Sequence, residues 1–283
     1  MKTPAWMDEM RTITSAIALI LQLCVVGASA QTADLVSPTV FRVCADPANL
    51  PLSGREQPGF ENEIATLFAD LLGRPLETTW FPMGPGFIRK TLRAGVCDVV
   101  IGYAQGDELV QNTNHYYASA YVLITRAGEA TAKVQTLSDP ALQGHRIGIV
   151  AGTPPATHLA RNGLIALAKP YPLVVDRRVE DPAADMLADL ETGAIDAAIL
   201  WGPIGGPLAK GNAALTVTPL LHETESPKMF YRITMGVRLG EQDWKRELNS
   251  LIRRNQDKID AILAKAGVPL VDDYGTALKP VSP

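Results

Sequence analysis

A motif that occurs twice constrains the fold of this chain more than any other feature of its sequence. The stretch LRAGVCDVVIG at residues 92–102 has a counterpart in LETGAIDAAILWG at residues 190–202. The matched residues, each 98 positions apart, are Leu92 and Leu190, Gly95 and Gly193, Asp98 and Asp196, and Ile101 and Ile199. Such an internal repeat predicts two lobes of similar construction, and 283 residues are enough to build them.

The repeated motif has a structural explanation. Its Leu completes the buried face of a helix, and its Gly takes the left-handed conformation that ends the helix. The apolar run after the Asp is typical of a strand buried on both sides. We therefore expect Asp98 and Asp196 to be structural residues at the entrance of a strand.

Strand and helix patterns alternate around both copies. In the first half, strands are predicted at FRVCAD, LETTWFP and CDVVIG, and helices from Phe60 to Gly73 and from Phe87 to Gly95. In the second half, strands are predicted at HRIGIVAGT, YPLVVDR and IDAAILWG, and helices at PATHLARNGL and AADMLADLETG. WGPIGGP is predicted to be a loop, because Pro203 and Pro207 disfavour a helix. This alternation predicts parallel sheets covered by helices.

Two extended segments connect the halves. YVLITRAGEA leaves the first lobe, and MFYRITMGVRLG returns to it before a long amphipathic helix from Asp243 to Ala266. The predicted fold is therefore α/β, with two lobes that are each a mostly parallel sheet flanked by helices, joined by two crossings around a hinged cleft. Lobe 1 comprises residues 31–126 and 231–283 in this prediction, and lobe 2 comprises residues 127–230.

Residues 1–30 have the pattern of a secretory signal peptide. Lys2 and Arg11 flank a polar lead, an apolar run covers residues 16–26, and the small residues 28–30 predict cleavage after Ala30. The run is shorter than the roughly 20 residues of a membrane span, so we expect an exported mature chain without one. An uncleaved anchor is the alternative.

Export leaves two cysteines, Cys44 and Cys97. In an oxidising compartment this pair favours a disulfide, which would close a loop of about 50 residues and stabilise the fold by about 4 kcal/mol in the chain-entropy model. Two buried free thiols are the alternative.

Charge and motifs exclude several kinds of chemistry. A formal charge of -4 without clusters of Lys or Arg argues against a nucleic-acid partner. The four histidines, His115, His145, His158 and His222, are far apart in the sequence and predict no metal site. Neither a Gly-x-Ser-x-Gly elbow nor a phosphate-binding loop occurs, and we expect no cofactor and no catalytic residues.

The order of elements, with GFENEIATLFADLLG and LQGHRIGIVAGT, resembles the type II periplasmic solute-binding proteins of ABC transporters. Within them, RVCADPANLPLS, GFIRKTLRAGVCDVVIG, AILWGPIGG and IDAILAKAGVPL resemble the MxaJ/XoxJ group. That group consists of periplasmic proteins associated with PQQ-dependent methanol dehydrogenases. The resemblance implies a periplasmic location and a methanol dehydrogenase as protein partner.

The chain departs from amino-acid binders of this fold at two places. Those proteins hold the ligand carboxylate with an Arg after the third strand, but GYAQGDELVQNTNHYY contains no Arg or Lys. They hold the ammonium with an Asp at the position where this chain has Trp201. A zwitterion would lack both counter-charges, so we do not expect amino-acid binding.

A ligand, either a small molecule or a peptide, would bind at the carboxyl ends of the strands. The candidate cleft residues are Asp46, Asn49, Trp80, Phe81, Gly102, Tyr103, Gly152, Thr153 and Trp201. Turn formation and packing explain the same residues equally well.

Three functions remain open. The resemblance implies a non-catalytic accessory protein that assists assembly, maturation or activation of a PQQ-dependent dehydrogenase through protein contacts. The alternative is a transport protein that binds an uncharged or non-amino-acid solute. A third possibility, a periplasmic enzyme, predicts turnover that Asp46→Ala abolishes.

Overall fold

The computed structural model describes residues 35–280 of the chain. Most of its strands follow one hydrogen-bonded path. The strands are β1 (Phe41–Ala45), β2 (Ala48–Asn49), β3 (Ser53–Gly54), β4 (Leu76–Trp80), β5 (Val99–Ala104), β6 (Gln111–Asn112), β7 (Tyr117–Arg126), β8 (Ile147–Val150), β9 (Lys169–Tyr171), β10 (Ala197–Trp201), β11 (Leu215–Pro219) and β12 (Phe230–Val237). The path is β4-β1-β5-β12-β7-β10-β8-β9. The predicted signal peptide and its cleavage site lie outside the described residues.

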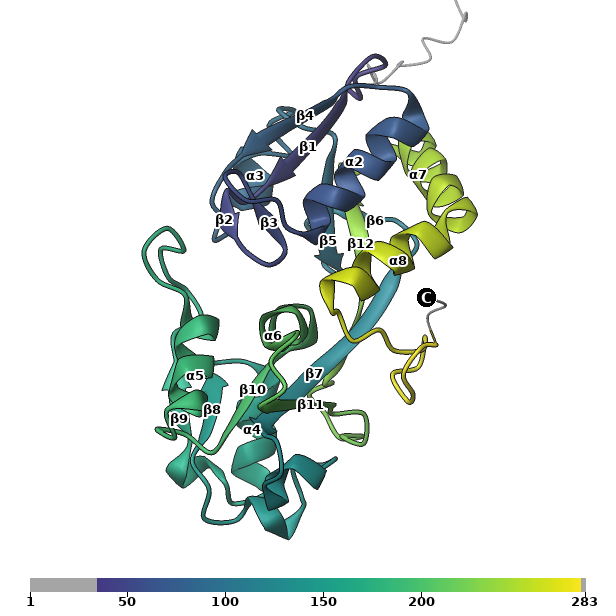
Figure 1. Ribbon diagram of the computed structural model, residues 1–283. Coiled ribbons are helices and arrows are strands. Elements are labelled where there is room, and N and C mark those ends of the chain that lie inside the picture. Colours follow the sequence, from purple (N-terminus) through teal and green to yellow (C-terminus); the bar gives the residue numbers. More distant parts are fainter. Residues whose placement is uncertain (1–34, 281–283) are drawn as a thin grey trace, which may run out of the picture. The chain divides into compact units, whose positions relative to one another are not determined.

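The helices are α2 (Phe60–Leu72), α3 (Phe87–Lys90), α4 (Pro154–Arg161), α5 (Pro182–Glu191), α6 (Gly202–Ala209), α7 (Gln242–Arg254) and α8 (Gln256–Ala266). Short 3-10 turns occur at Ala130–Lys133, Pro140–Leu142 and Ile165–Leu167. Helices α2, α7 and α8 lie over the β1 half of the strand path, and α4, α5 and α6 lie over the β10 half (Figure 1).

Strand β7 is shared by two lobes. Residues 117–120 pair with β12, whereas residues 121–125 pair with β10. The strands β4, β1 and β5 are parallel to one another, as are β10, β8 and β9, while β12 and β7 join these groups by antiparallel pairing. The predicted two-lobe α/β fold is confirmed, and we call the lobes 1 and 2 in chain order. The exact boundaries at residues 126 and 230 remain predictions.

The C-terminal helices complete lobe 1, as predicted. Trp244 of α7 packs edge-on against Phe41 of β1, with ring centroids 6.1 Å apart. Leu248, Ile259 and Leu263 lie in the same buried cluster as Phe41. The chain therefore enters lobe 1, builds lobe 2, and returns to cover the lobe where it began.

Four predicted elements were wrong in extent or kind. The helix predicted from Phe87 to Gly95 ends at Lys90, because Thr91, whose hydroxyl donates to Phe87 O, leaves the helical conformation. The single C-terminal helix is two helices, because the side chain of Asn255 donates to Leu251 O and the backbone leaves the helical conformation there. The predicted strand YPLVVDR ends at Tyr171, since Pro172 cannot donate to a ladder. WGPIGGP forms α6, because Pro203 falls in the first turn and Gly206 lies against Gly267 O, where a Cβ would stand 2.3 Å away.

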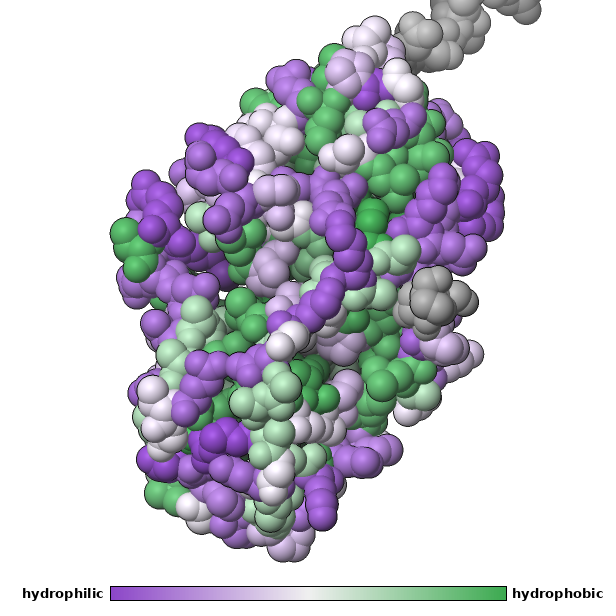
Figure 2. Space-filling view, in the orientation of Figure 1, coloured by the Kyte–Doolittle hydropathy of each residue, from purple (hydrophilic) through white to green (hydrophobic). Residues whose placement is uncertain are grey.

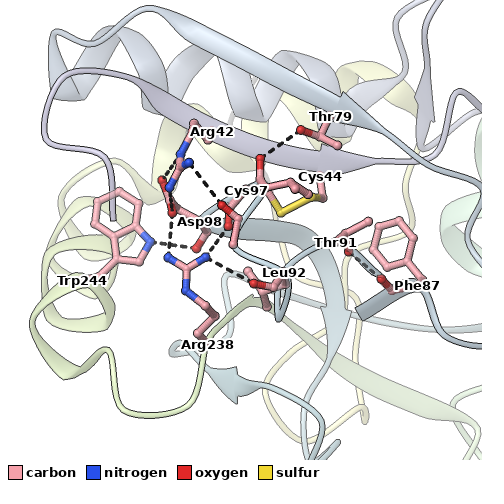
Figure 3. The surroundings of a disulfide bond; sticks show 12 residues. Arg42, Cys44, Thr79, Phe87, Thr91, Leu92, Cys97, Asp98, Arg238 and Trp244 are labelled. Carbon is pink, nitrogen blue, oxygen red and sulfur yellow. Dashed lines mark hydrogen bonds and ion pairs between the residues drawn. A yellow bond between two sulfur atoms is a disulfide. The ribbon is translucent and has the colours of Figure 1, made fainter. Parts of the chain in front are cut away.

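The repeated Asp of lobe 1 is the centre of a buried ionic cluster (Figure 3). Arg42 binds Asp98 through two bonds, Nε to Oδ2 at 2.8 Å and Nη2 to Oδ1 at 2.6 Å. Arg238 adds a bond from Nη2 to Oδ1 at 2.7 Å. Asp98 is 1% exposed and Arg238 is 7% exposed, so the charges are paired almost out of contact with water.

Lobe 2 repeats this cluster. Arg146 binds both carboxylate oxygens of Asp196, at 3.1 and 2.8 Å, and Arg126 approaches to 3.6 Å. The arginines also bind the same carbonyl oxygens in both copies: Arg238 those of Leu92 and Cys97, and Arg126 those of Leu190 and Ile195. Both arginines begin an Arg-x-Gly-Glu segment whose Glu binds the Arg in turn. The predicted structural role of the repeated Asp is confirmed.

The predicted disulfide is present in lobe 1. Cys44 of β1 is bonded to Cys97, which precedes β5, with Cα atoms 5.6 Å apart (Figure 3). Both residues are buried with Leu92 and Phe87. The bond fixes the start of β5 against β1.

We expect removal of this disulfide to lower the free energy of unfolding by about 4 kcal/mol, because the unfolded chain regains the freedom of a long loop. Urea unfolding of the mature protein, compared with the double variant Cys44→Ser and Cys97→Ser, measures this. Reductant should destabilise only the native protein. A difference below about 1 kcal/mol would contradict the prediction.

Candidate functional site

A groove of about 250 Å³ lies between the lobes. Lobe 1 contributes Leu50, the shared strand β7 contributes Tyr121, and lobe 2 contributes mainly apolar residues, among them Val150, Leu173, Leu200, Trp201 and Ile204. A second hollow of about 290 Å³ adjoins it, sharing Leu50, Arg177 and Asp181 and adding Pro47 and Gln57. The segment 172–181, which precedes α5, extends toward lobe 1 in Figure 1, and Figure 2 shows apolar residues gathered beside α6.

An aromatic cluster forms the inner wall of the groove. Trp201, at the end of β10, contacts Tyr121 edge-on at a centroid distance of 5.5 Å and Tyr231 at 5.7 Å. Trp201 also packs on the core of lobe 1. Burial, with Tyr231 nearby, raises the pKa of Tyr121 well above its ordinary value. Tyr121 is therefore uncharged at neutral pH.

Two predicted cleft residues line this groove, namely Trp201 and Thr153. Thr153 precedes α4, and its hydroxyl donates to Val150 O at 2.6 Å. Gly152 forms the turn between β8 and α4 with a left-handed φ of 76°. These residues shape the lobe 2 side of the groove.

Asp46 and Asn49 are buried in lobe 1. The two carboxylate oxygens of Asp46 accept bonds from Ala48 N at 2.8 Å and Met83 N at 2.6 Å. The Asp46 carboxylate therefore holds two turns together. The side-chain oxygen of Asn49 has no hydrogen-bond partner among the described residues.

The remaining predicted residues lie apart from the groove walls. Arg55 stacks on Trp80 at 5.7 Å, and Phe81 packs against Phe87 at 6.3 Å. Gly102 N donates to the Tyr116 hydroxyl at 3.0 Å. Tyr103 donates to Asp107 at 2.9 Å and lines a separate pocket within lobe 1.

Glu61 of α2 was missed by the sequence analysis. It is 5% exposed, and its Oε1 has no hydrogen-bond partner among the described residues. A Cβ at Gly102 would stand 1.8 Å from this oxygen, so only glycine fits there. Burial, with a smaller contribution from Asp46, raises the pKa of Glu61 to about 8. Its position on the buried stripe with Ile64 and Phe68 was the available signal.

Arg177 is a second missed residue, because it lies on the irregular segment after β9 rather than at a strand end. It lines both the groove and the adjoining hollow, and no hydrogen bond or ion pair involves its side chain among the described residues. Asp181 lies beside it, but its carboxylate caps α5 by accepting from Ala183 N and Ala184 N.

Among residues 35–280, no group of three or more His, Cys, Asp and Glu side chains could hold a metal ion. The same residues contain no helix long and apolar enough to cross a membrane.

Known proteins resemble the chain over most of its length, although no protein-family model matches it. Protein MoxJ of Methylorubrum extorquens is 30% identical over 284 residues, covering 92% of this chain and 93% of that protein. The crystal structure of the periplasmic binding protein XoxJ from Methylobacterium extorquens AM1 is 42% identical, with a TM-score of 0.70 over 83% of this chain and 100% of that one. MxaJ from Methylophaga aminisulfidivorans MPT is 26% identical, with a TM-score of 0.69 over 82% of this chain and 100% of its own. The chain belongs to the MxaJ/XoxJ family of periplasmic binding proteins.

Proposed function

We propose that this protein is a non-catalytic accessory of a PQQ-dependent methanol dehydrogenase, acting in the periplasm after cleavage behind Ala30. It assists assembly, maturation or activation of the enzyme through protein contacts. The observation that carries the proposal is the full-length similarity to MoxJ and XoxJ, together with a groove whose wall is aromatic where amino-acid binders carry an Asp.

The groove supports contact with a protein better than capture of a charged solute. Trp201, Tyr121 and Leu173 give it an apolar lining, and Arg177 is its one cationic side chain among the described residues. Asp46, a candidate for an ammonium group, does not line the groove, and its carboxylate accepts from two backbone donors. Half-buried aromatic and exposed apolar side chains beside an Arg are typical of protein interfaces.

The outer lip of the groove offers a direct test. Leu173 lines the groove and is 51% exposed, whereas Leu167 lies in the same lobe, away from the groove, and is 50% exposed. Asp at position 173 would place a charge on the proposed contact surface, and Asp at position 167 would not.

We expect deletion of the gene to reduce PQQ-dependent methanol dehydrogenase activity and the cofactor content of the periplasmic enzyme. The native protein and Leu167→Asp should restore both. Leu173→Asp should restore less than about a tenth of each, because burying an unpaired charge in a protein contact costs at least about 1.4 kcal/mol of binding free energy. Normal holoenzyme in the deletion strain would overturn the proposal. A saturable uncharged solute that closes the lobes would favour the transport alternative.

A further inference from the structure

A pocket of about 600 Å³ lies within lobe 1 and shares no residue with the groove between the lobes. It is bounded by the segment 83–93, which contains α3, and by Tyr103 and Leu109. Its volume falls in the range of about 300–1,000 Å³ that is typical of small-molecule sites.

The pocket has a rigid apolar floor and an apolar rim. Phe87 and Ile88 are 4% and 5% exposed and pack in the cluster that contains the disulfide. Met83 and Leu109 at the rim are 40% and 49% exposed. The disulfide thus supports the floor from behind, while the rim leaves apolar surface in contact with water.

Positive charge without a partner lines the same pocket. Arg89 and Arg93 are exposed, and neither side chain has a hydrogen bond or an ion pair with any described residue. Lys90 lies beside them over the Phe81 ring at 5.4 Å. The carboxylate of Asp107, close to Tyr103, already accepts from the Tyr103 hydroxyl at 2.9 Å and from Leu109 N at 2.8 Å.

We propose that this pocket binds an organic anion, a small molecule with an apolar body and a carboxylate. The guanidinium groups of Arg89 and Arg93 would hold the carboxylate, because the planar donors of Arg match its two oxygens. Met83, Phe87 and Leu109 would cover the apolar body. This inference is independent of the proposed function, since it concerns another surface of lobe 1.

The experiment is a titration of the ¹⁵N-labelled mature protein with benzoate, followed by ¹H–¹⁵N correlation spectra. Benzoate should shift the amide signals of Gly84, Gly86 and Leu109 saturably. Benzamide, which has the same ring without the charge, should bind about tenfold more weakly or worse. Arg89→Gln and Arg93→Gln should each weaken benzoate binding by about tenfold, while Arg253→Gln, which removes an exposed charge from α7, should leave it unchanged.

Three results would overturn the inference. One is the absence of saturable shifts at these amides up to about 10 mM benzoate. Another is equal affinity for benzamide and benzoate, which would remove the role of the charge. The third is an equal loss of affinity in Arg253→Gln and in the pocket variants, which would indicate attraction to net charge rather than a site.

Discussion

Replacing Asp98 by Ala is expected to lower the free energy of unfolding by about 3–5 kcal/mol. The substitution removes the carboxylate shared by Arg42 and Arg238, and Arg238, only 7% exposed, keeps Glu241 as its remaining partner. Urea unfolding at pH 7 measures the loss. The internal repeat supplies the control, Asp196→Ala, which breaks the corresponding cluster of lobe 2. There the Asp196 side chain is 16% exposed, and its partner Arg146 is better solvated. We expect that variant to lose about 1–2 kcal/mol.

The sign of the pH dependence gives a second check on Asp98. Burial disfavours its ionised form, but hydrogen bonds from Arg42 and Arg238 outweigh burial, so the pKa lies below its ordinary value. The stabilisation is therefore present above the unfolded pKa of about 4 and is lost as the pH falls through the folded pKa. The native protein and Asp98→Ala should converge in stability in acid. Equal losses at pH 7 and in acid, or a larger loss for Asp196→Ala, would contradict the account.

Glu61 is expected to make the fold less stable as the pH rises from about 5 to 8. The unfolded chain ionises this residue above about pH 4.3, whereas burial keeps it protonated in the folded protein up to its pKa of about 8. Over that interval the unfolded state binds fewer protons, which costs about 1.4 kcal/mol of stability per pH unit. Asp46, Tyr116 and Tyr117 lie near enough to interact with the charge.

The variant Glu61→Gln keeps the shape of the protonated side chain and removes the titration. Its free energy of unfolding, relative to that of the native protein, should rise by on the order of 4 kcal/mol between pH 5 and pH 8, as measured by chemical unfolding. Glu63→Gln is the matched control, because Glu63 lies two residues along α2 and is 43% exposed. A difference between Glu61→Gln and the native protein that does not change with pH would refute the raised pKa.

The repeat made the fold predictable, because its residues act locally. Leu92 and Leu190 face the core, and Gly95 and Gly193 have left-handed φ angles of 74° and 76°. The arginines that bind the repeated Asp residues could not be inferred, since Arg42 and Arg238 come from positions 56 and 140 residues away. Helix α6 could not be inferred either, because it depends on packing against residues that are distant in the sequence.

The candidate site was predictable only in part. The rule that ligands bind at strand ends located Thr153 and Trp201, which line the groove. The same rule could not predict that Gly102 and Tyr103 face different parts of lobe 1, although neighbouring strand residues face opposite sides of a sheet. Gly102 faces Glu61, and Tyr103 lines the pocket of Arg89 and Arg93. Arg177 lies on an irregular segment whose position depends on tertiary structure.

In the proposed function, the groove between the lobes contacts a PQQ-dependent methanol dehydrogenase. The most direct test is a calorimetric titration of that enzyme, purified from the deletion strain, with the mature protein and with Leu173→Asp and Leu167→Asp. We expect saturable binding by the native protein and by Leu167→Asp, and binding by Leu173→Asp that is at least about tenfold weaker. Absence of binding by the native protein, or equal binding by all three, would contradict it.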